Sequence, residues 1–352
     1  MNLQEILVEA ISKSASDVFV IPGRPIMYKV DEHFSKNDDN ILFSEDTLKI
    51  IEELYKLNPD RDFSKIKPLG DDDFSISVSN LGRFRVNVYK QRSTWATVIR
   101  VINFDLPDPE KIGIPSPVMD LSFTNKGLVL VTGSAGSGKS TTLSCIINAI
   151  NQTQEKHIVT LEDPAEFFHR HNKSIISQRE ISTDTISYAT ALRASLRQSP
   201  DVILIGEMRD AETIAIAMNA AETGHLVFST LHTVGASTTI DRVINAFPAE
   251  QQSQVRLQLS MVLKAVISQQ LVPSKTGSLV PAFEIMIANN AVRNLIRESK
   301  SHQIDNVIQS SSSEGMITMD TSLINLFKKG EIYKDLAVSL SNNPEVMAKK
   351  LV

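Results

Sequence analysis

The sequence predicts an α/β protein in two parts: a small α+β domain, then a larger domain with a mostly parallel sheet and helices on both faces. In the first part, segments such as Gly82–Tyr89 alternate apolar and polar residues, as half-buried strands do. Residues 103–117 are rich in proline and lack periodicity, which indicates an interdomain linker. In the second part, apolar runs alternate with segments of helical spacing, which is typical of a helix-covered parallel sheet. These runs are 127–132, 157–161, 202–206 and 226–230.

We therefore expect a first domain over residues 1–102, a linker over 103–117 and a second domain over 118–352. The first domain should contain two helices, at 3–13 and 45–57. Its strands should lie at 18–21, 27–30, 74–79, 82–89 and 94–102. Ser44, just ahead of two acidic residues, is the expected N-cap of the second helix. Roughly the last 70 residues should be mainly helical, interrupted by a surface loop at Ser310–Ser313.

The composition is that of an ordinary globular protein, with 42% apolar and 22% charged residues in a chain of 352. A net charge of −5 argues against a protein that coats nucleic acid. The single cysteine, Cys145, excludes an intrachain disulfide and a multi-cysteine zinc site, which fits a reducing cytoplasm. No apolar run approaches the roughly 18 residues of a membrane span, and the first residues lack a signal-peptide pattern. We expect a cytoplasmic protein that meets a membrane only through a partner.

A glycine-rich segment, Gly-Ser-Ala-Gly-Ser-Gly-Lys-Ser, lies between a predicted buried strand and a predicted helix. Strand, glycine-rich turn and helix is the context that a phosphate-binding loop requires. Lys139 would reach the β- and γ-phosphates of a nucleotide, and the Ser140 hydroxyl would take a Mg²⁺ position. An ordinary Gly/Ser turn does not explain a lysine at the mouth of a helix. The expected nucleotide-binding residues of this loop are Gly133, Ser134, Ala135, Gly136, Ser137, Gly138, Lys139, Ser140 and Thr141.

Acidic residues follow two of the predicted buried strands. Glu207 comes directly after the apolar run 202–206, at the sheet edge where ligands bind in α/β proteins; the alternative is a surface acid. Glu162, Asp163 and Glu166 follow the run 157–161. Because acids this close repel one another, one of them is a candidate to polarise an attacking water, although an acidic turn after a strand is also common.

Basic residues beside these strands have two open interpretations. His232 follows the run 226–230 and could donate a hydrogen bond to a γ-phosphate, or it could be a satisfied structural histidine. His225, at the start of that run, has the same two interpretations. Arg193 and Arg197 are four residues apart on one face of a predicted helix. They would contact phosphate or a neighbouring subunit, or form a solvated charged face.

Four blocks, in this order, resemble the type IV pilus retraction ATPases, the PilT/PilU branch of the GspE/PilT-like secretion ATPases, over nearly the whole chain. They are the Walker A motif, the aspartate box, the Walker B motif and the histidine box, at Gly133–Ser140, Thr160–Phe167, Asp201–Asp210 and Ala221–Thr233. The resemblance implies a RecA-like P-loop ATPase core behind a small α+β, PAS-like N-terminal domain.

The resemblance also implies roles for the candidate residues. Glu166 matches the general base, with Glu162 and Asp163 supporting metal and water, and Glu207 matches the Walker B glutamate. His232 matches the residue near the γ-phosphate, and His225 the other histidine of its box. Arginines of the first domain match residues that approach the nucleotide, partly from an adjacent subunit; the alternative is an exposed basic strand face. They are Arg83, Arg85 and Arg92.

Two features favour the retraction branch. The assembly and type II secretion branch usually carries a four-cysteine zinc insert, which one cysteine cannot form. The retraction branch carries a helical motif that Ala291–Glu298 resembles, with Val292 where isoleucine is usual. The alternative is an amphipathic surface helix with its leucine inward. The matching residues are Ala291, Arg293, Asn294, Leu295 and Arg297. Phe19 and Ser199 depart from the family pattern, where a histidine and an acid are usual.

The resemblance thus implies a homohexameric, Mg²⁺-dependent ATPase that powers pilus retraction and twitching motility. It would act on an inner-membrane pilus platform protein from the cytoplasmic face of the inner membrane, with paralogous pilus ATPases as further partners and no nucleic acid or zinc. The alternatives are an assembly or secretion-system motor of the same family, an accessory subunit that binds ATP without fast hydrolysis, and a helicase-like motor, which the acidic charge disfavours.

Overall fold

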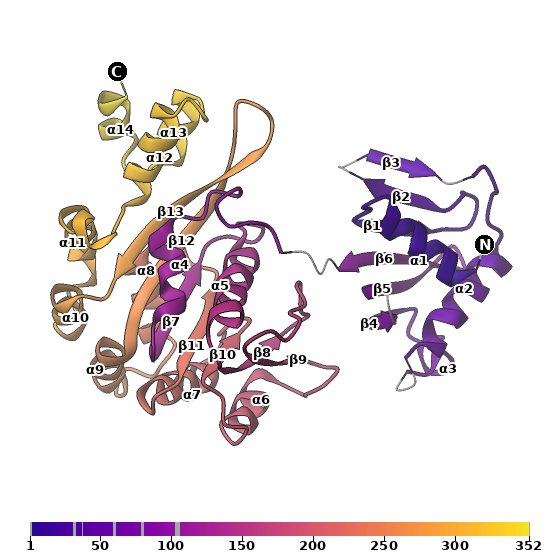
Figure 1. Cartoon of the computed structure of the whole chain (residues 1–352), viewed down its shortest axis with the longest axis horizontal. Coiled ribbons are helices and arrows are strands. Elements are labelled where there is room, and N and C mark those ends of the chain that lie inside the picture. Colours follow the sequence, from indigo (N-terminus) through magenta and orange to yellow (C-terminus); the bar gives the residue numbers. More distant parts are fainter. Residues whose placement is uncertain are drawn as a thin grey trace. The chain divides into compact units, whose positions relative to one another are not determined.

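The computed structural model describes residues 2–30, 33–36, 38–58, 61–78, 81–102 and 106–351. Contacts divide the chain into two units, of which the first comprises Met1–Asp105 with Glu166–Phe168 (Figure 1). The second unit comprises Leu106–Ala165 and His169–Val352. Residues 103–105 of the predicted linker lie outside the described residues. The rest of that segment groups with the second unit, and its last two residues already begin a short helix.

The first unit is an antiparallel sheet with helices packed on it. Its strands and helices are β1 (Asp17–Val20), β2 (Met27–Val30), β3 (His33–Lys36), β4 (Asp71–Val78), β5 (Gly82–Gln91), β6 (Thr94–Ile102), α1 (Leu3–Ser12), α2 (Ser44–Lys56) and α3 (Phe63–Ile66). The strand order is β3-β2-β1-β6-β5-β4, and each paired strand runs antiparallel to its neighbour. Periodicity does not predict β3 or α3, which are only four residues long.

The alternation along β5 sorts its side chains onto two faces. Phe84, Val86 and Val88 are fully buried and pack in one core with apolar residues of α1 and α2. Their neighbours in sequence, Arg83 and Arg85, stay partly exposed. At the start of α2 the prediction of Ser44 as N-cap is wrong. Phe43 takes that position and gives no side-chain cap; instead its own backbone N–H donates to Asp46 Oδ2 at 2.8 Å.

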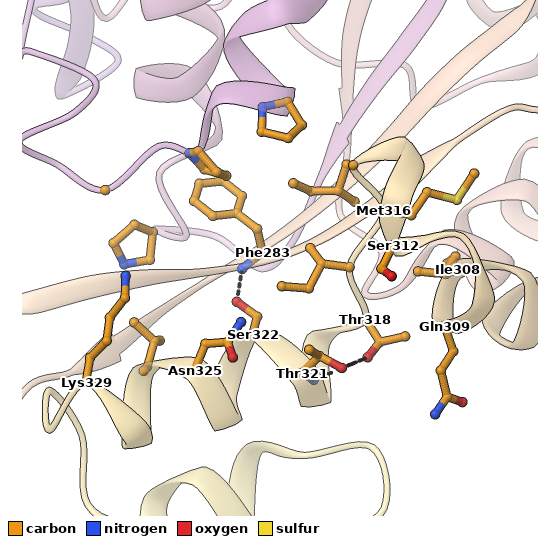
Figure 2. A pocket seen from close by; sticks show the side chains of 18 residues that line it. Phe283, Ile308, Gln309, Ser312, Met316, Thr318, Thr321, Ser322, Asn325 and Lys329 are labelled. Carbon is orange, nitrogen blue, oxygen red and sulfur yellow. Dashed lines mark hydrogen bonds between the residues drawn. The ribbon is translucent and has the colours of Figure 1, made fainter.

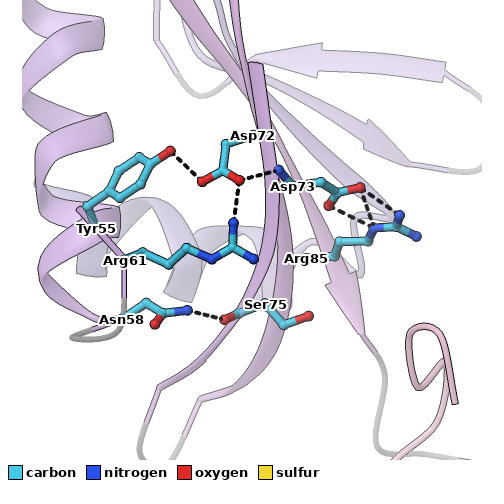
Figure 3. Close-up of polar contacts among 7 residues, drawn as sticks. All are labelled: Tyr55, Asn58, Arg61, Asp72, Asp73, Ser75 and Arg85. Atoms are coloured by element: carbon cyan, nitrogen blue, oxygen red, sulfur yellow. Dashed lines mark hydrogen bonds and ion pairs between the residues drawn. The ribbon is translucent and has the colours of Figure 1, made fainter. Parts of the chain in front are cut away.

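A polar cluster joins α2 to β4 in this unit (Figure 3). The Tyr55 hydroxyl donates to Asp72 Oδ2 at 2.8 Å, and the Arg61 guanidinium pairs with the other oxygen of the same carboxylate. Burial and the Asp72 hydrogen bond raise the pKa of Tyr55. One strand further, Arg85 donates from Nε and Nη2 to the Asp73 carboxylate, with a shortest distance of 2.6 Å. The neighbouring carboxylates Asp72 and Asp73 of β4 thus each neutralise one arginine, on opposite faces of the strand.

The second unit is built on a mostly parallel sheet in the order β13-β12-β7-β11-β10-β8-β9, in which only the β12–β13 pair is antiparallel. Its strands are β7 (Gly127–Thr132), β8 (His157–Glu162), β9 (Ile175–Glu180), β10 (Val202–Ile205), β11 (Leu226–Leu231), β12 (Leu263–Pro273) and β13 (Leu279–Ile287). Its α-helices are α4 (Ser116–Met119), α5 (Lys139–Thr153), α6 (Tyr188–Ser195), α7 (Ala211–Glu222), α8 (Ala236–Asn245), α9 (Gln252–Val262), α10 (Asn290–Arg297), α11 (Ile304–Ser310), α12 (Met319–Lys328), α13 (Lys334–Leu340) and α14 (Pro344–Lys350). Short 3₁₀ helices are η1 (Asp120–Phe123), η2 (Ser301–Gln303) and η3 (Ser312–Glu314).

Helices cover both faces of this sheet. Along β7, Leu128 and Leu130 pack in a core with α6 to α9, whereas Val129 and Val131 pack in a second core with α5. All residues of β7 and β11 are buried, which explains why these strands are continuous apolar runs without alternation. The predicted fold class is therefore confirmed. No helix in the described part of the chain combines the length and apolarity needed to cross a bilayer.

The last 70 residues are mainly helical, as predicted, with α10 to α14 following the end of β13. A hairpin of β12 and β13 extends the sheet, because an apolar run of this length fits a buried strand as well as a buried helix. The predicted loop at 310–313 is instead the end of α11 followed by η3. The segment is helical because Ile308 is buried in the core and fixes α11 there. The serines that follow do not prevent a short helix. Beyond it, α12 to α14 pack on the far end of the hairpin through Val272 and Ala282.

The Figure 3 cluster yields a stability prediction. Replacing Tyr55 with phenylalanine removes the hydroxyl that donates to Asp72, and we expect the free energy of unfolding to fall by about 1 kcal/mol. Trp95, the single tryptophan, contacts Phe63 edge-to-face in the same unit, so its fluorescence during urea unfolding reports this transition. Tyr333→Phe, at an exposed tyrosine of the second unit, is the matched control. Equal midpoints for wild type and Tyr55→Phe would show that the hydrogen bond contributes nothing.

Candidate functional site

One edge of the parallel sheet gathers most of the predicted site residues. The strands β7, β11, β10 and β8 are neighbours and run in the same direction, so their carboxyl ends lie together. The glycine-rich loop follows β7, His232 follows β11 and Glu207 follows β10, two residues beyond the strand end. Glu162 ends β8, and Asp163 comes next. This is the edge at which ligands bind in open α/β sheets.

The glycine-rich loop has a backbone that only glycine allows at three points. Gly138 has φ +86° and immediately precedes α5, and Gly136 has φ +73°. At Gly133 an added Cβ would lie 2.3 Å from the carbonyl oxygen of Gln269 on β12, a contact no side chain can make. The loop is thereby pressed against β12 while its backbone enters the N-terminus of α5, where N–H groups and the helix dipole favour an anion.

Lys139 is buried and stabilises the loop from within. Its Nζ donates to the carbonyl oxygens of Gly133 at 3.0 Å and Ser134 at 2.7 Å. The ammonium therefore sits inside the turn, where a phosphate would meet it.

Gln269 supports the same loop from β12, although nothing in the sequence around it signals this role. Thr142, in the first turn of α5, donates through Oγ1 to Gln269 Oε1 at 2.8 Å, and both side chains are buried. An added Cβ at Gly138 would lie 2.8 Å from Gln269 Nε2. Because Gln269 lies far along the chain from the loop, only the sheet order reveals the contact.

Glu207 and His232 meet at the sheet edge, as their strand positions suggest. Glu207 Oε1 pairs with Arg209 Nη2 at 2.5 Å, and its Oε2 lies 3.5 Å from His232 Nε2, an ion-pair distance. Glu207 is the least exposed of the three, with 14% of its side chain exposed, while Arg209 and His232 are exposed. Together with Thr230 and Arg242 these residues line a small pocket of about 430 Å³.

Tyr188, which no sequence motif points to, lies among the acidic residues of this edge. Burial raises the pKa of its hydroxyl, and the charges of Asp163, Glu207 and Glu162 add to that effect. Its oxygen would lie 2.8 Å from a Cβ added at Gly206, so glycine before Glu207 leaves room for the phenol. Three of the predicted acidic residues thus share one neighbour.

The side chains present fit a magnesium ion bound mainly through phosphate and water. Mg²⁺ prefers oxygen ligands, and Ser140 in the first turn of α5 and Glu207 supply a hydroxyl and a carboxylate. Glu207 Oε2 is buried and has no hydrogen-bond partner among the described side chains, so it can accept from a metal-bound water. Among the described residues no group of three His, Cys, Asp or Glu could hold a metal by itself.

The remaining predicted residues of the second unit, and Glu166, have other surroundings. His225 precedes β11, at the opposite end of the strand from His232, where its Nδ1 lies 2.9 Å from the Ala220 carbonyl oxygen at the end of α7. The prediction that Arg193 and Arg197 share a helix face is wrong, because α6 ends at Ser195 and Arg197 lies beyond it. The helix ends ahead of Ser199-Pro200, where the residue before proline disfavours a helical backbone. Arg193 pairs with Glu212 on the surface. Glu166 groups with the first unit.

The predicted arginines of the first unit differ in their surroundings. Arg83 and Arg85 lie on β5, and Arg85 is held by Asp73 as described above. Arg92 is exposed in the turn between β5 and β6, with φ +46°.

The helix α10 carries the predicted retraction motif. Val292 and Ile296 are buried in the core and Leu295 packs partly against it. Arg293 faces α9 and donates to four carbonyl oxygens at 2.8–3.2 Å, three of which belong to the end of α9 and the residue after it. It therefore caps a helix C-terminus. The exposed residues of the motif are Ala291, Asn294 and Arg297.

Comparison with known proteins agrees with this geometry. The family described as Type II/IV secretion system protein matches residues 1–318. The type IV pilus retraction ATPase PilT of Pseudomonas aeruginosa is 42% identical over 345 residues, which cover 98% of this chain and 99% of that protein. A twitching motility protein of Neisseria gonorrhoeae is 50% identical over 277 residues, covering 78% and 74% of the two chains.

Solved structures give the same result. The crystal structure of the pilus retraction motor PilT with bound ADP has a TM-score of 0.89 at 42% identity, and the match covers 98% of both chains. The ATPase DotB of Legionella pneumophila follows with a TM-score of 0.77 at 27% identity, covering 95% of this chain and 94% of that one. This chain therefore belongs to the type II/IV secretion system protein family, among its PilT-like ATPases, as the order of the four sequence blocks predicts.

Proposed function

We propose that this chain is a Mg²⁺-dependent ATPase that works as a homohexamer and drives the retraction of a type IV pilus. The observation that carries the proposal is the sheet edge at which the phosphate-binding loop, Glu207 and His232 meet. The relatives named for pilus retraction and for twitching motility support this choice of the work that hydrolysis performs.

The loop residues would bind the phosphates of ATP. Lys139 exchanges its two carbonyl partners for phosphate oxygens, and the N–H groups at the start of α5 donate to the same oxygens. Ser140 and Glu207 would hold Mg²⁺, which when bound neutralises charge that develops on the phosphates. The Glu166 carboxylate would orient or deprotonate the attacking water, and Glu162 and Asp163 would support metal and water.

His232 would donate a hydrogen bond to the γ-phosphate. Its Nε2 lies 3.5 Å from Glu207 Oε2, so the two groups can respond together when the phosphate leaves. Arg83, Arg85 and Arg92 would complete the site from the first unit of the same or an adjacent subunit. For Arg85 this requires the Asp73 carboxylate to release the guanidinium.

The motor would act on an inner-membrane pilus platform protein, at the cytoplasmic face of that membrane. One alternative is a motor of the same family that drives pilus assembly or secretion. The other is an accessory subunit that binds nucleotide.

Replacing Lys139 with alanine should reduce ATP turnover to background, because its ammonium is the positive charge that the loop holds for the phosphates. Steady-state phosphate release from purified protein measures this. Lys173→Ala, at an exposed lysine of the same unit, should behave as wild type. Retained turnover in Lys139→Ala would remove the loop from the mechanism.

Replacing Glu207 or Glu166 with glutamine should leave ATP binding in place and lower kcat by about 100-fold or more. The two variants are compared with wild type in one buffer, with the mass of the assembly determined in parallel. If a hexamer binds ATP but the wild type turns over no faster than the variants, the accessory role replaces the motor.

The motif of α10 is best tested at its exposed residues. Asn294→Ala with Arg297→Ala should spare ATP hydrolysis and stop pilus retraction in cells, since these side chains face away from the core. Arg293→Ala should instead lower thermal stability, because it leaves carbonyl oxygens at the end of α9 without their donor. Normal retraction in the double variant would exclude a coupling role for this surface.

A further inference from the structure

Glu284 is a buried carboxylate that no part of the proposed chemistry uses. It lies on β13 and is 2% exposed. Its Oε1 accepts the N–H of Ala236 at 2.8 Å, and its Oε2 accepts the N–H of Met319 at 3.4 Å. These residues are the first of α8 and of α12, so one side chain serves two helix N-termini.

One of the two backbone segments held by Glu284 is the loop that follows His232 at the sheet edge. Only three residues separate His232 from Ala236. Gly235, with φ +89°, donates its N–H to Ser268 Oγ at 2.9 Å, and Ser268 is the direct cross-strand partner of Glu284. Thr239 of α8 donates to the Gly235 carbonyl oxygen at 2.7 Å and shares a hydrogen bond with Thr233. Two neighbouring side chains of the β12–β13 hairpin thus bind successive N–H groups just after His232.

The other end of the same carboxylate is tied to the C-terminal helices. Ser322 of α12 accepts the backbone N–H of Phe283 at 3.0 Å, one residue before Glu284 (Figure 2). Residues of α12 also line the pocket of about 600 Å³ in that view, between the hairpin and α11. The helix that receives Glu284 is therefore fixed to β13 at two adjacent residues.

Keeping this carboxylate buried has an energetic cost. Burial raises the pKa of Glu284, and the charges of Asp305 on α11 and Asp320 on α12 add to that effect, whereas the Ala236 and Met319 N–H groups lower it. An apolar residue would fill the same space without that cost. The hydrogen bonds that its two oxygens accept from Ala236 and Met319 therefore explain why a carboxylate occupies this position.

We propose that Glu284 is a positioning residue for ATP turnover, which fixes the backbone after His232 and joins it to α12. The inference rests on the proposed role of His232 at the γ-phosphate. Glu284 acts through the loop, so its loss should displace the histidine from Glu207 without disturbing the phosphate loop. We expect lower kcat with little change in KM for ATP, because a small misplacement of a catalytic group is costly.

The test is a double-mutant cycle in the full-length protein. Steady-state ATP hydrolysis is measured for wild type, Glu284→Ala, His232→Ala and the double variant. Glu284→Ala should lower kcat about 10- to 100-fold with KM within about twofold, and it should cost nothing further when His232 is already alanine. Glu284→Gln, which keeps an acceptor oxygen for Ala236, should recover part of the loss. Glu250→Gln, at an exposed carboxylate of the same unit, is the control.

Each result has a definite meaning. Equal losses from Glu284→Ala in both backgrounds, or wild-type kcat in a variant of lower melting temperature, would overturn the inference and leave only a structural role. If Glu284→Ala does not fold, Ser268→Ala is put through the same cycle, because it removes only the hydroxyl that accepts the Gly235 N–H. A wild-type protein without ATP turnover would instead overturn the proposed function.

Discussion

The central strands of the second unit are buried on both faces, and this burial determines where chemistry can occur. No polar side chain can be placed along β7 or β10 without losing contact with water, so polar groups collect where these strands end. Because the strands are parallel, those ends share one edge. The loop after β7, Glu207 after β10 and His232 after β11 meet there as a consequence of the packing that stabilises the fold.

The site is then positioned by residues from the hairpin at the edge of the sheet. Gln269 on β12 supports the phosphate-binding loop, and Ser268 beside it supports the loop after β11. Glu284, the partner of Ser268, adds the connection to α12. One antiparallel pair of strands thus contacts both loops that are proposed to touch the phosphates, although it carries none of the family motifs.

The sequence predicts the buried strands and their loops because continuous apolar runs and glycine-rich turns are local signals. It does not predict strand order, which places β11 between β7 and β10 and so brings His232 to Glu207. Contacts between distant segments are also invisible to periodicity, as Tyr188 beside Gly206 and Arg293 at the end of α9 illustrate. The family resemblance supplies roles for Glu166 and the arginines, but nothing local in the sequence reveals that Asp73 holds Arg85.

The two hydrogen bonds from Lys139 to its own loop have a consequence for the thermodynamics of nucleotide binding. They hold the turn in shape with carbonyl oxygens in the place of phosphate oxygens, so little backbone entropy remains to be lost when a nucleotide arrives. The ammonium is desolvated when the chain folds, not when the ligand binds. When the nucleotide is released, the Lys139 ammonium is not left unpaired, since it can again donate hydrogen bonds to the two carbonyl oxygens.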